Sequence, residues 1–380
     1  MIYLTKPYFD DNEINAIKET FNSGWVAGQG PKGEELSEHI KKITNTKFAI
    51  PVNNCTAGLH LSLLSIGIKP GDEVLVSDYT FPATGHSVMF CGAKPRFIDV
   101  NLRTYIIESS LIEEKINNKT KAIIVVHEFG QMADMDKILE IAENYNLKII
   151  EDAACSMGAK QKGEPAGSFG DIAAFSFHAR KNTTSGEGGI IVTNNEDYAD
   201  IISSLSCFGM ESAFKRQKDF KIPSFKALGY NYKLSDINAA IALEQLKKYP
   251  KVLEKKRKLV NLYNKLLENN KFITTPFEEK YNYHVYQTYA IVLDEKIDRN
   301  KLIVSLRDDS IQTQIGTYAS HIQPVYNSKD ICPNSLFLYN QSLALPLYYE
   351  LKEEEVTYVV DKLKFHIKEQ LESKNGNTKR

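Results

Sequence analysis

The residues with the clearest chemical potential lie in the stretch DIAAFSFHARKNTTSGEGGIIVT. It is typical of a buried strand from Ile172 to Phe177, a polar turn, a Gly-rich loop and a second apolar strand. The turn carries Lys181, five residues after Ser176. A lysine held between two buried strands loses hydration, which favours its neutral form. A neutral amine is a nucleophile that can form a Schiff base with a carbonyl compound.

A second stretch, KIIEDAA, places the acids Glu151 and Asp152 at the end of a predicted strand, upstream of Lys181. An acid and a lysine in this arrangement fit pyridoxal 5′-phosphate (PLP). This cofactor needs a carboxylate beside its ring nitrogen, so that the ring stays protonated and accepts electrons. Taken singly, a loop lysine is usually a solvated surface residue, and a strand-end aspartate is usually a cap or turn residue. The combination favours the cofactor.

Composition bounds the class of protein. The 380 residues suffice for one large and one smaller domain. A net charge of −1 gives no reason to expect nucleic acid or a membrane surface as a partner. No apolar run approaches a membrane span, and the first residues lack the apolar core of a signal peptide. The five cysteines show no CxxC pairing and no zinc-ligand spacing, which indicates reduced thiols in a cytoplasmic protein without a metal site.

Strands and helices alternate through the first part of the chain, which predicts an α/β fold whose mostly parallel sheet is flanked by helices. The expected strands are 48–52, 73–76, 96–100, 121–126 and 147–150.

Two of these strand ends carry candidate ligand-binding groups. The strand 48–52 leads into a helix that starts near Thr56, and free N–H groups at a helix start can cradle a phosphate. An ordinary N-cap by Asn54 or Thr56 is the alternative. Phe81 follows the next strand, where an open α/β sheet binds its ligands, and it is either a stacking group or part of the core.

The helices predicted outside this alternation set the limits of the domains. Residues 10–22 suit an amphipathic helix with Ile14, Ile17 and Phe21 on one face. A later helix starts near Ser235 and is expected to end at Pro250, before a charged helix over 251–268. We therefore place a large, PLP-binding domain at 1–250. A smaller α+β C-terminal domain follows at 251–380.

The order and spacing of ten segments resemble the DegT-type family of PLP-dependent sugar aminotransferases, which have the aspartate-aminotransferase (type I) fold. The resemblance covers nearly the whole chain. The segments are SGWVAGQGP, NNCTAGLHLSLLSIGIKPGDEVLV, TFPAT, GAKPRFIDV, KAIIVVHEFGQMADMD, IIEDAA, SFGDIAAFSFHARKNTTSGEGG, LGYNYKLSDINAAIALEQL, HIQPVY and ALPLY.

This resemblance implies roles for residues around the cofactor. Lys181 matches the lysine that forms the Schiff base and then moves the proton, and Asp152 matches the acid paired with the ring nitrogen. Cys155 takes the place of a Gln, His or Glu near the phenolic oxygen of the cofactor. Because a thiol is a weaker hydrogen-bond donor than an amide, Cys155 departs from the family pattern in its capacity to donate there.

The remaining cofactor contacts are implied in the same way. Ser176 and Thr56, with the amides around Cys55 and Ala57, match a phosphate cradle, and Phe81 matches the aromatic that stacks on the ring.

Other matched positions concern the partner subunit and the substrate. Asn231 matches an asparagine that reaches the phosphate of the neighbouring subunit's cofactor, which implies a homodimer with shared active sites. Trp25, His321 and Tyr326 are candidate substrate contacts. Trp25 is as readily a packing anchor. The pair Lys215–Arg216 can meet phosphate groups or be a solvated charged surface.

The resemblance implies an enzyme that moves an amino group from L-glutamate to a keto sugar, most often a nucleotide-linked keto-deoxy sugar used in surface polysaccharide biosynthesis. A small phosphorylated ketone, such as dihydroxyacetone phosphate, is the alternative acceptor. A PLP-binding regulatory protein is a second alternative. A related dehydratase branch has His at the position of Lys181, so the lysine argues against that branch.

Overall fold

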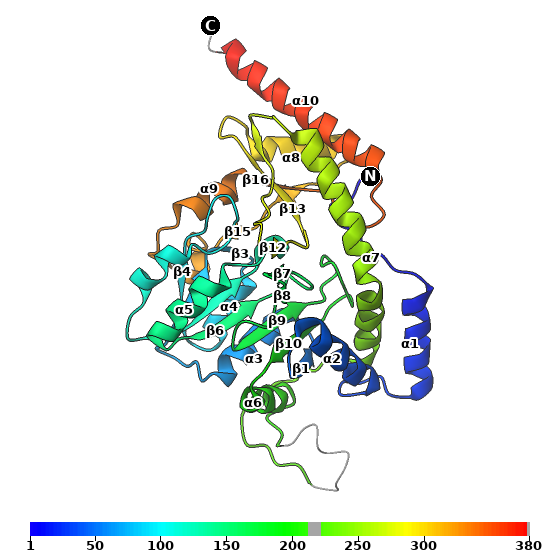
Figure 1. The fold of residues 1–380 in the computed structure, drawn as a ribbon, viewed down its shortest axis with the longest axis vertical. Coiled ribbons are helices and arrows are strands. Elements are labelled where there is room, and N and C mark those ends of the chain that lie inside the picture. Colours follow the sequence, from blue (N-terminus) through cyan, green and yellow to red (C-terminus); the bar gives the residue numbers. More distant parts are fainter. Residues whose placement is uncertain (212–221, 378–380) are drawn as a thin grey trace.

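The computed structural model describes residues 1–211 and 222–377. Its centre is a seven-stranded sheet with the order β1-β10-β9-β6-β5-β2-β4 (Figure 1). Neighbours from β9 to β4 pair in parallel, and β10 runs antiparallel to both of its neighbours. In sheet order the strands are Phe48–Val52, Gly189–Thr193, Ile172–Ser176, Lys148–Asp152, Thr120–Val126, Glu73–Ser77 and Lys94–Ile98. The predicted mostly parallel sheet is confirmed.

Helices cover both faces of this sheet. One face packs against α2 (Pro31–Thr44), α5 (Met135–Tyr145) and the first turns of α7 (Asp236–Leu267). The other face packs against α3 (Cys55–Ser65) and α4 (Ala83–Phe90). Because both faces are covered, the central strands have apolar middles, and every residue of β9 is buried. Each buried aliphatic side chain contributes about 1.5–3 kcal/mol to the stability of the sheet whose strand ends carry the site.

The helix α7 corrects two sequence predictions at once. We expected a helix to end at Pro250 and a second one to follow, but α7 continues through Pro250 as one helix of 32 residues (Figure 1). Proline removes one helical hydrogen bond without preventing helix on both sides. Buried residues on both sides, such as Leu246 and Leu253, hold the two halves on one core. The domain boundary at 250 stays a prediction.

The C-terminal part builds a smaller, antiparallel sheet with the order β11-β13-β16-β14. Its strands are Ile273–Thr274, Tyr289–Leu293, Ser342–Leu345 and Gln314–Ile315. The helices α8 (Arg299–Asp308), α9 (Pro333–Gln341) and α10 (Glu353–Asn377) accompany it. The last turns of α7 share an apolar core with this sheet, α8 and α10.

Short strands and helices complete the chain. The pair β3 (Tyr79–Thr80) and β15 (Tyr318–Ala319) connects the region after β2 to the C-terminal part, and α6 (Glu196–Ser206) lies beside β1. The remaining short elements are β7 (Lys160–Gln161), β8 (Glu164–Pro165), β12 (Asn282–Tyr283) and the 3-10 turns Ser109–Leu111, Glu113–Lys115, Glu128–Gly130 and Pro324–Tyr326.

The first helix, α1 (Asp11–Ser23), packs with the opposite face from the one its apolar residues suggest. It begins with a capping box between Asp10 and Glu13 and buries Glu13, Ala16 and Thr20. Ile14 is 52% exposed and Phe21 is 57% exposed. The structure thus leaves an apolar face of α1 open on the outside of the chain.

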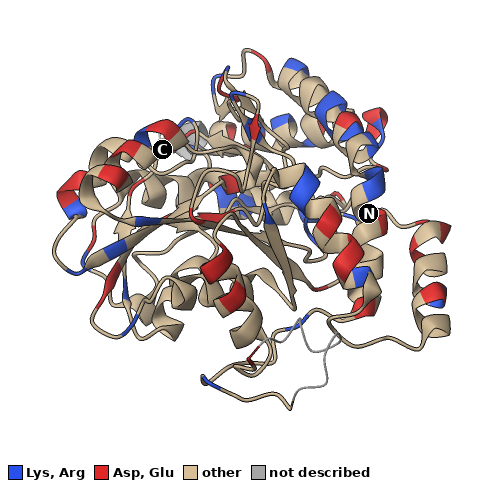
Figure 2. Ribbon diagram, turned by 60° about the horizontal axis from the view of Figure 1, so that its bottom comes forward, with Lys and Arg blue, Asp and Glu red and all other residues tan. Residues whose placement is uncertain are grey.

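Charges of both signs are interspersed over the helices (Figure 2). Within residues 1–211 and 222–377, no helix is long and apolar enough to cross a membrane.

Candidate active site

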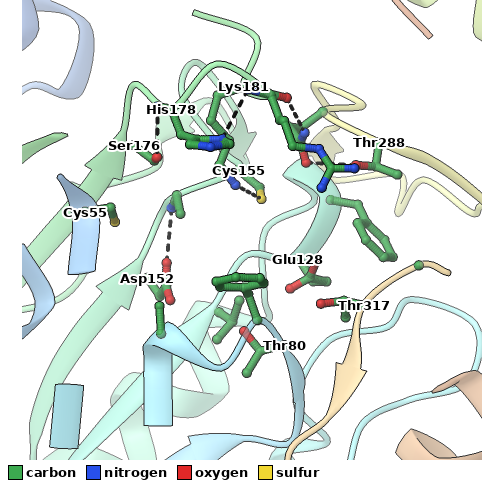
Figure 3. A pocket seen from close by; sticks show the side chains of 18 of the residues that line it. Cys55, Thr80, Glu128, Asp152, Cys155, Ser176, His178, Lys181, Thr288 and Thr317 are labelled. Atoms are coloured by element: carbon green, nitrogen blue, oxygen red, sulfur yellow. Dashed lines mark hydrogen bonds between the residues drawn. The ribbon is translucent and has the colours of Figure 1, made fainter. Parts of the chain in front are cut away.

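A cavity of about 540 Å³ lies at the carboxyl ends of the parallel strands. Asp152 ends β6 and Ser176 ends β9, and both side chains line the cavity with Lys181 from the loop that follows (Figure 3). Carboxyl ends of parallel strands are the usual ligand site of open α/β sheets. The sheet therefore brings together three residues that are far apart in the sequence.

Lys181 reaches across the cavity toward Cys155. Its Nζ lies 3.1 Å from Cys155 Sγ. Burial alone would lower the pKa of Lys181, but Cys155 and the carboxyl of Glu128 raise it above its usual value. Burial also raises the pKa of the Cys155 thiol to about 11, so the amine holds the proton and the sulfur accepts. The expected neutral amine is thus wrong for this arrangement, because acidic neighbours outweigh desolvation.

The Gly-rich loop after Lys181 is explained by a close backbone approach. A Cβ on Gly189 would lie 2.7 Å from the backbone nitrogen of Cys55. Gly186 has a φ of +83°, which a side chain disfavours. Glycine here lets β10 run tightly past the start of α3.

Asp152 is held as an acceptor that faces the cavity. Thr84 Oγ1 donates to its Oδ2 at 2.7 Å, and the N–H of Ala154 donates to Oδ1 at 3.2 Å. Burial raises the pKa of Asp152 against these hydrogen bonds and the charge of Lys181. A cationic ring nitrogen is the kind of partner that would offset this desolvation.

The start of α3 opens onto the same cavity. Asn54 caps the helix by accepting from the N–H of Ala57 at 2.8 Å. Cys55 and Thr56 line the cavity, and their N–H groups at the helix start have no helical acceptor. Ala57 is not among the lining residues, and its amide serves the cap instead. The N-cap and the phosphate cradle were posed as alternatives, and this geometry accommodates both.

Aromatic and acidic neighbours complete the walls. Phe81 lines the cavity and is 64% exposed, with its ring edge-on to Tyr318 at 6.1 Å. The acid next to Asp152, Glu151, points away from the cavity. It accepts from His127 at 2.9 Å and from three backbone N–H groups at 2.7–2.9 Å. That pair is a buried support beneath the site.

Besides Ala57, four predicted residues do not line this cavity. Trp25 lies in the loop after α1, and Asn231 has its side chain near Lys233. His321 pairs with Asp78 at 2.7 Å, and the hydroxyl of Tyr326 donates to the carbonyl of Pro82. These contacts within the chain leave the roles predicted for the four residues as proposals. Lys215 and Arg216 lie outside the described residues.

Several lining residues escaped the sequence predictions. Glu128 lines the cavity just after β5, and Arg180 lines it next to Lys181. The small sheet contributes Gln314 and Thr317 from more than a hundred residues away. Glu128 follows a predicted strand, and this position is the sequence signal that could have identified it. Gln314 and Thr317 carry no local pattern, because long-range packing brings them to the cavity.

A mostly parallel sheet whose edge holds a lysine opposite a buried acid fits the type I fold of PLP-dependent aminotransferases. The chain belongs to the DegT/DnrJ/EryC1/StrS aminotransferase family, whose model matches residues 7–364.

Individual relatives and a solved structure match with similar breadth. The spore coat polysaccharide biosynthesis protein SpsC of Bacillus subtilis is 34% identical, with 95% of this chain and 96% of that protein covered. GDP-perosamine synthase of Escherichia coli O157:H7 is 34% identical, with 94% and 96% covered. The PLP form of Spr1654 from Streptococcus pneumoniae superposes with a TM-score of 0.89 at 26% identity, with 96% and 98% covered.

The cavity fits this cofactor on its own geometry. It offers an amine for the aldehyde, a desolvated carboxylate for the ring nitrogen, and a helix start with Ser176 for the phosphate. Bound PLP supplies an electron sink for negative charge at a substrate carbon.

Proposed function

We propose that the enzyme transfers an amino group from L-glutamate to a nucleotide-linked keto-deoxy sugar for surface polysaccharide synthesis. The observation that carries the proposal is the cavity around Lys181 and Asp152, in a chain 34% identical over nearly its full length to a GDP-perosamine synthase. The relative named for spore coat polysaccharide biosynthesis points to the same use. The chain is proposed to act as a homodimer.

The roles proposed for the polar residues follow from their positions. The Lys181 amine binds the cofactor and, once released by the amino donor, holds or moves the proton at the substrate carbon. Asp152, fixed by Thr84, keeps the ring nitrogen protonated. Ser176, Thr56 and the first amides of α3 bind the phosphate.

Arg180 is suited to the carboxylate of the amino donor. Its guanidinium is exposed at the cavity wall and donates to Gln314 Oε1. Within the described part of the chain it forms no ion pair, so the donors of its fork that Gln314 does not use are open to a carboxylate. We propose that glutamate is oriented here, with its amine toward Lys181.

One alternative concerns the acceptor. A small phosphorylated ketone in place of the sugar would use the same Lys181 chemistry. Membership of an aminotransferase family favours turnover over a regulatory protein that only keeps the cofactor. Replacing Lys181 with Ala should therefore abolish turnover.

The absorbance of the purified holoenzyme tests the proposal. Adding L-glutamate alone should replace the yellow band by the band of the aminated cofactor. The bleached enzyme is then given keto-sugar nucleotides and, separately, triose phosphates. Recovery of the yellow band only with a keto-sugar nucleotide supports the proposal. Recovery only with a triose phosphate selects the alternative acceptor, and a band that glutamate leaves unchanged contradicts the donor.

A further inference from the structure

Glu128 is a buried acid for which the proposed reaction has no role. It follows His127 at the end of β5 and begins the turn Glu128–Gly130. The next residue, Phe129, has a left-handed φ of 55°. This costly conformation is held by hydrogen bonds from Val285 and Gln287 to the turn, at 3.1 and 2.8 Å. The backbone is thus fixed so that the Glu128 side chain enters the cavity.

The carboxyl of Glu128 has no side-chain partner among residues 1–211 and 222–377. The residue is 6% exposed and lines the cavity, and it makes no ion pair there. Burial, opposed by the charge of Lys181, raises the pKa of Glu128 to about 8. The carboxyl is therefore mostly a neutral acid at pH 7, which can donate a hydrogen bond. The titratable groups that face it are Lys181, Asp152, Cys155 and Tyr79.

The chemistry of the cofactor indicates what this donor would meet. In PLP the carbonyl carbon lies opposite the ring nitrogen, with the phosphate arm on one side and the phenolic oxygen on the other. Asp152 would meet the ring nitrogen and Lys181 the carbonyl carbon, so these two residues define the axis from nitrogen to carbonyl. Figure 3 shows Cys55 and Ser176 on one side of the line between them and Glu128 on the other. With the phosphate at the start of α3, the phenolic oxygen falls on the side of Glu128.

The residue that would otherwise serve this oxygen is a poor donor. Cys155 stands three residues after Asp152, where the resemblance implies Gln, His or Glu, and its sulfur is already 3.1 Å from Lys181 Nζ. A thiol donates weakly. We propose that Glu128 is the hydrogen-bond donor to the phenolic oxygen of bound PLP, replacing the donor that Cys155 does not provide. The inference depends on cofactor binding by Lys181 and not on the identity of the acceptor.

A spectrophotometric titration of the holoenzyme, without substrate, tests this role. The phenolic oxygen shares the proton of the yellow form, and a donor on that oxygen makes it less basic. Glu128→Ala should therefore keep the yellow band to a pH about one unit higher than in the wild type. Glu128→Gln keeps an N–H donor and should titrate close to the wild type. Glu140→Ala, on the exposed side of α5, is the matched control and should not shift.

Rescue separates a contact from a structural defect. Cys155→Gln in the Glu128→Ala background restores a donor at the neighbouring position and should bring the titration back toward the wild type. If Glu128→Ala does not fold, the single variant Cys155→Gln serves instead, because a second donor should move the titration to lower pH. An unshifted Glu128→Ala, or failure of Cys155→Gln to lower the titration in either background, would overturn the proposal. Because no substrate is present, these results do not depend on the keto sugar.

Discussion

At the scale of single residues, the site works by balancing burial against close partners. Lys181 illustrates this balance, because its acidic neighbours Cys155 and Glu128 raise a pKa that burial would lower. Asp152 shows the opposite case, since burial dominates over two hydrogen bonds. We therefore expect bound PLP to change both groups. Its positively charged ring offsets the burial of the Asp152 carboxylate, and its aldehyde reacts with the Lys181 amine.

The role proposed for Arg180 predicts a change in donor binding. Arg180→Gln removes a charge-assisted hydrogen bond that is worth about 1.5–3 kcal/mol. The L-glutamate concentration that gives half the maximal bleaching rate should rise about 10- to 100-fold, with a smaller effect on the rate at saturation. Single-turnover absorbance measures both quantities. Arg307→Gln, on the exposed side of α8, should behave as the wild type. An unchanged half-saturating concentration would place the donor carboxylate elsewhere.

The lowered pKa of Glu151 predicts that the stability of the protein depends on pH. Burial would raise its pKa, but His127 and the N–H groups of Gly167 and Gly170 hold it below its usual value. Its stabilisation is therefore present above the ordinary glutamate pKa, about 4.3, and is lost as the pH falls through the lower folded value. Glu151→Gln turns an amide toward these donors and should cost about 2–4 kcal/mol at pH 7.

Urea unfolding at several pH values checks this expectation. The difference between wild type and Glu151→Gln should shrink below about pH 4, where the wild-type carboxylate also becomes protonated. Glu143→Gln, on the exposed side of α5, is the control for the loss of one charge. A difference that stays constant with pH would mean that the carboxylate is not what the N–H groups stabilise.

At the scale of elements, α7 places a lysine where no charge is expected. Lys256 is 4% exposed, and its Nζ donates to Asn182 Oδ1 at 2.5 Å and to the carbonyl of Gln287 at 3.3 Å. Burial lowers its pKa to about 7. Through Lys256, α7 thereby connects Asn182, which follows Lys181, to Gln287, which lies just before β13 of the small sheet. This contact carries the free-energy cost of desolvating an amine.

Because burial lowers the pKa of Lys256, the effect of Lys256→Met on the free energy of unfolding should depend on pH. Between about pH 7 and 10.4, the unfolded wild-type chain holds a proton that the folded chain lacks, so its unfolding free energy gains up to about 1.4 kcal/mol per pH unit. The variant loses that gain, and its stability relative to wild type should fall as the pH rises from 7 to 10. Urea unfolding measures this trend. Lys265→Met, on an exposed turn of α7, should track the wild type, and parallel curves for Lys256→Met would show that Lys256 stays charged.

The strands and helices show how much of the fold could be predicted from the sequence. Strands that are mostly apolar, such as β9 before Ser176, were predictable because local composition alone distinguishes them. Asp152 was expected beyond a strand ending at Ile150, yet β6 includes it, since pairing with β5 and β9 extends the strand. The run of α7 through Pro250 depends on cores on both sides of the proline. Such extensions depend on tertiary partners that no local window contains.

The candidate site divides in the same way. Lys181, Asp152 and Ser176 sit in sharp local motifs at strand ends, and the sheet brings them to one cavity as expected. Gln314 and Thr317 carry no local signal, because the small sheet delivers them from a distant part of the chain. The acidic environment of Lys181 was equally invisible, since it is a sum over side chains from three separate elements.

At the scale of the whole molecule, one chain leaves apolar surface uncovered. On α1, Ile14 is 52% exposed and Phe21 is 57% exposed. In the segment before α7, Phe225 is 62% exposed and Leu228 is 89% exposed. Asn231 follows that segment and does not line the cavity of its own chain. These features support the proposed homodimer, in which the segment around Asn231 reaches the partner's cofactor. Sedimentation should give twice the 43.0 kDa of the chain.

Subunit mixing tests the shared site directly. Lys181→Ala removes the amine, and Asn231→Asp sets a negative charge against the phosphate, so each homodimer should be inactive at limiting PLP. If Asn231 serves the partner's cofactor, a mixed dimer holds one site with both residues intact. Random exchange makes half of the dimers mixed, so about a quarter of the wild-type specific activity should appear. If Asn231 serves its own subunit, each site in the mixed dimer keeps one defect and mixing restores nothing.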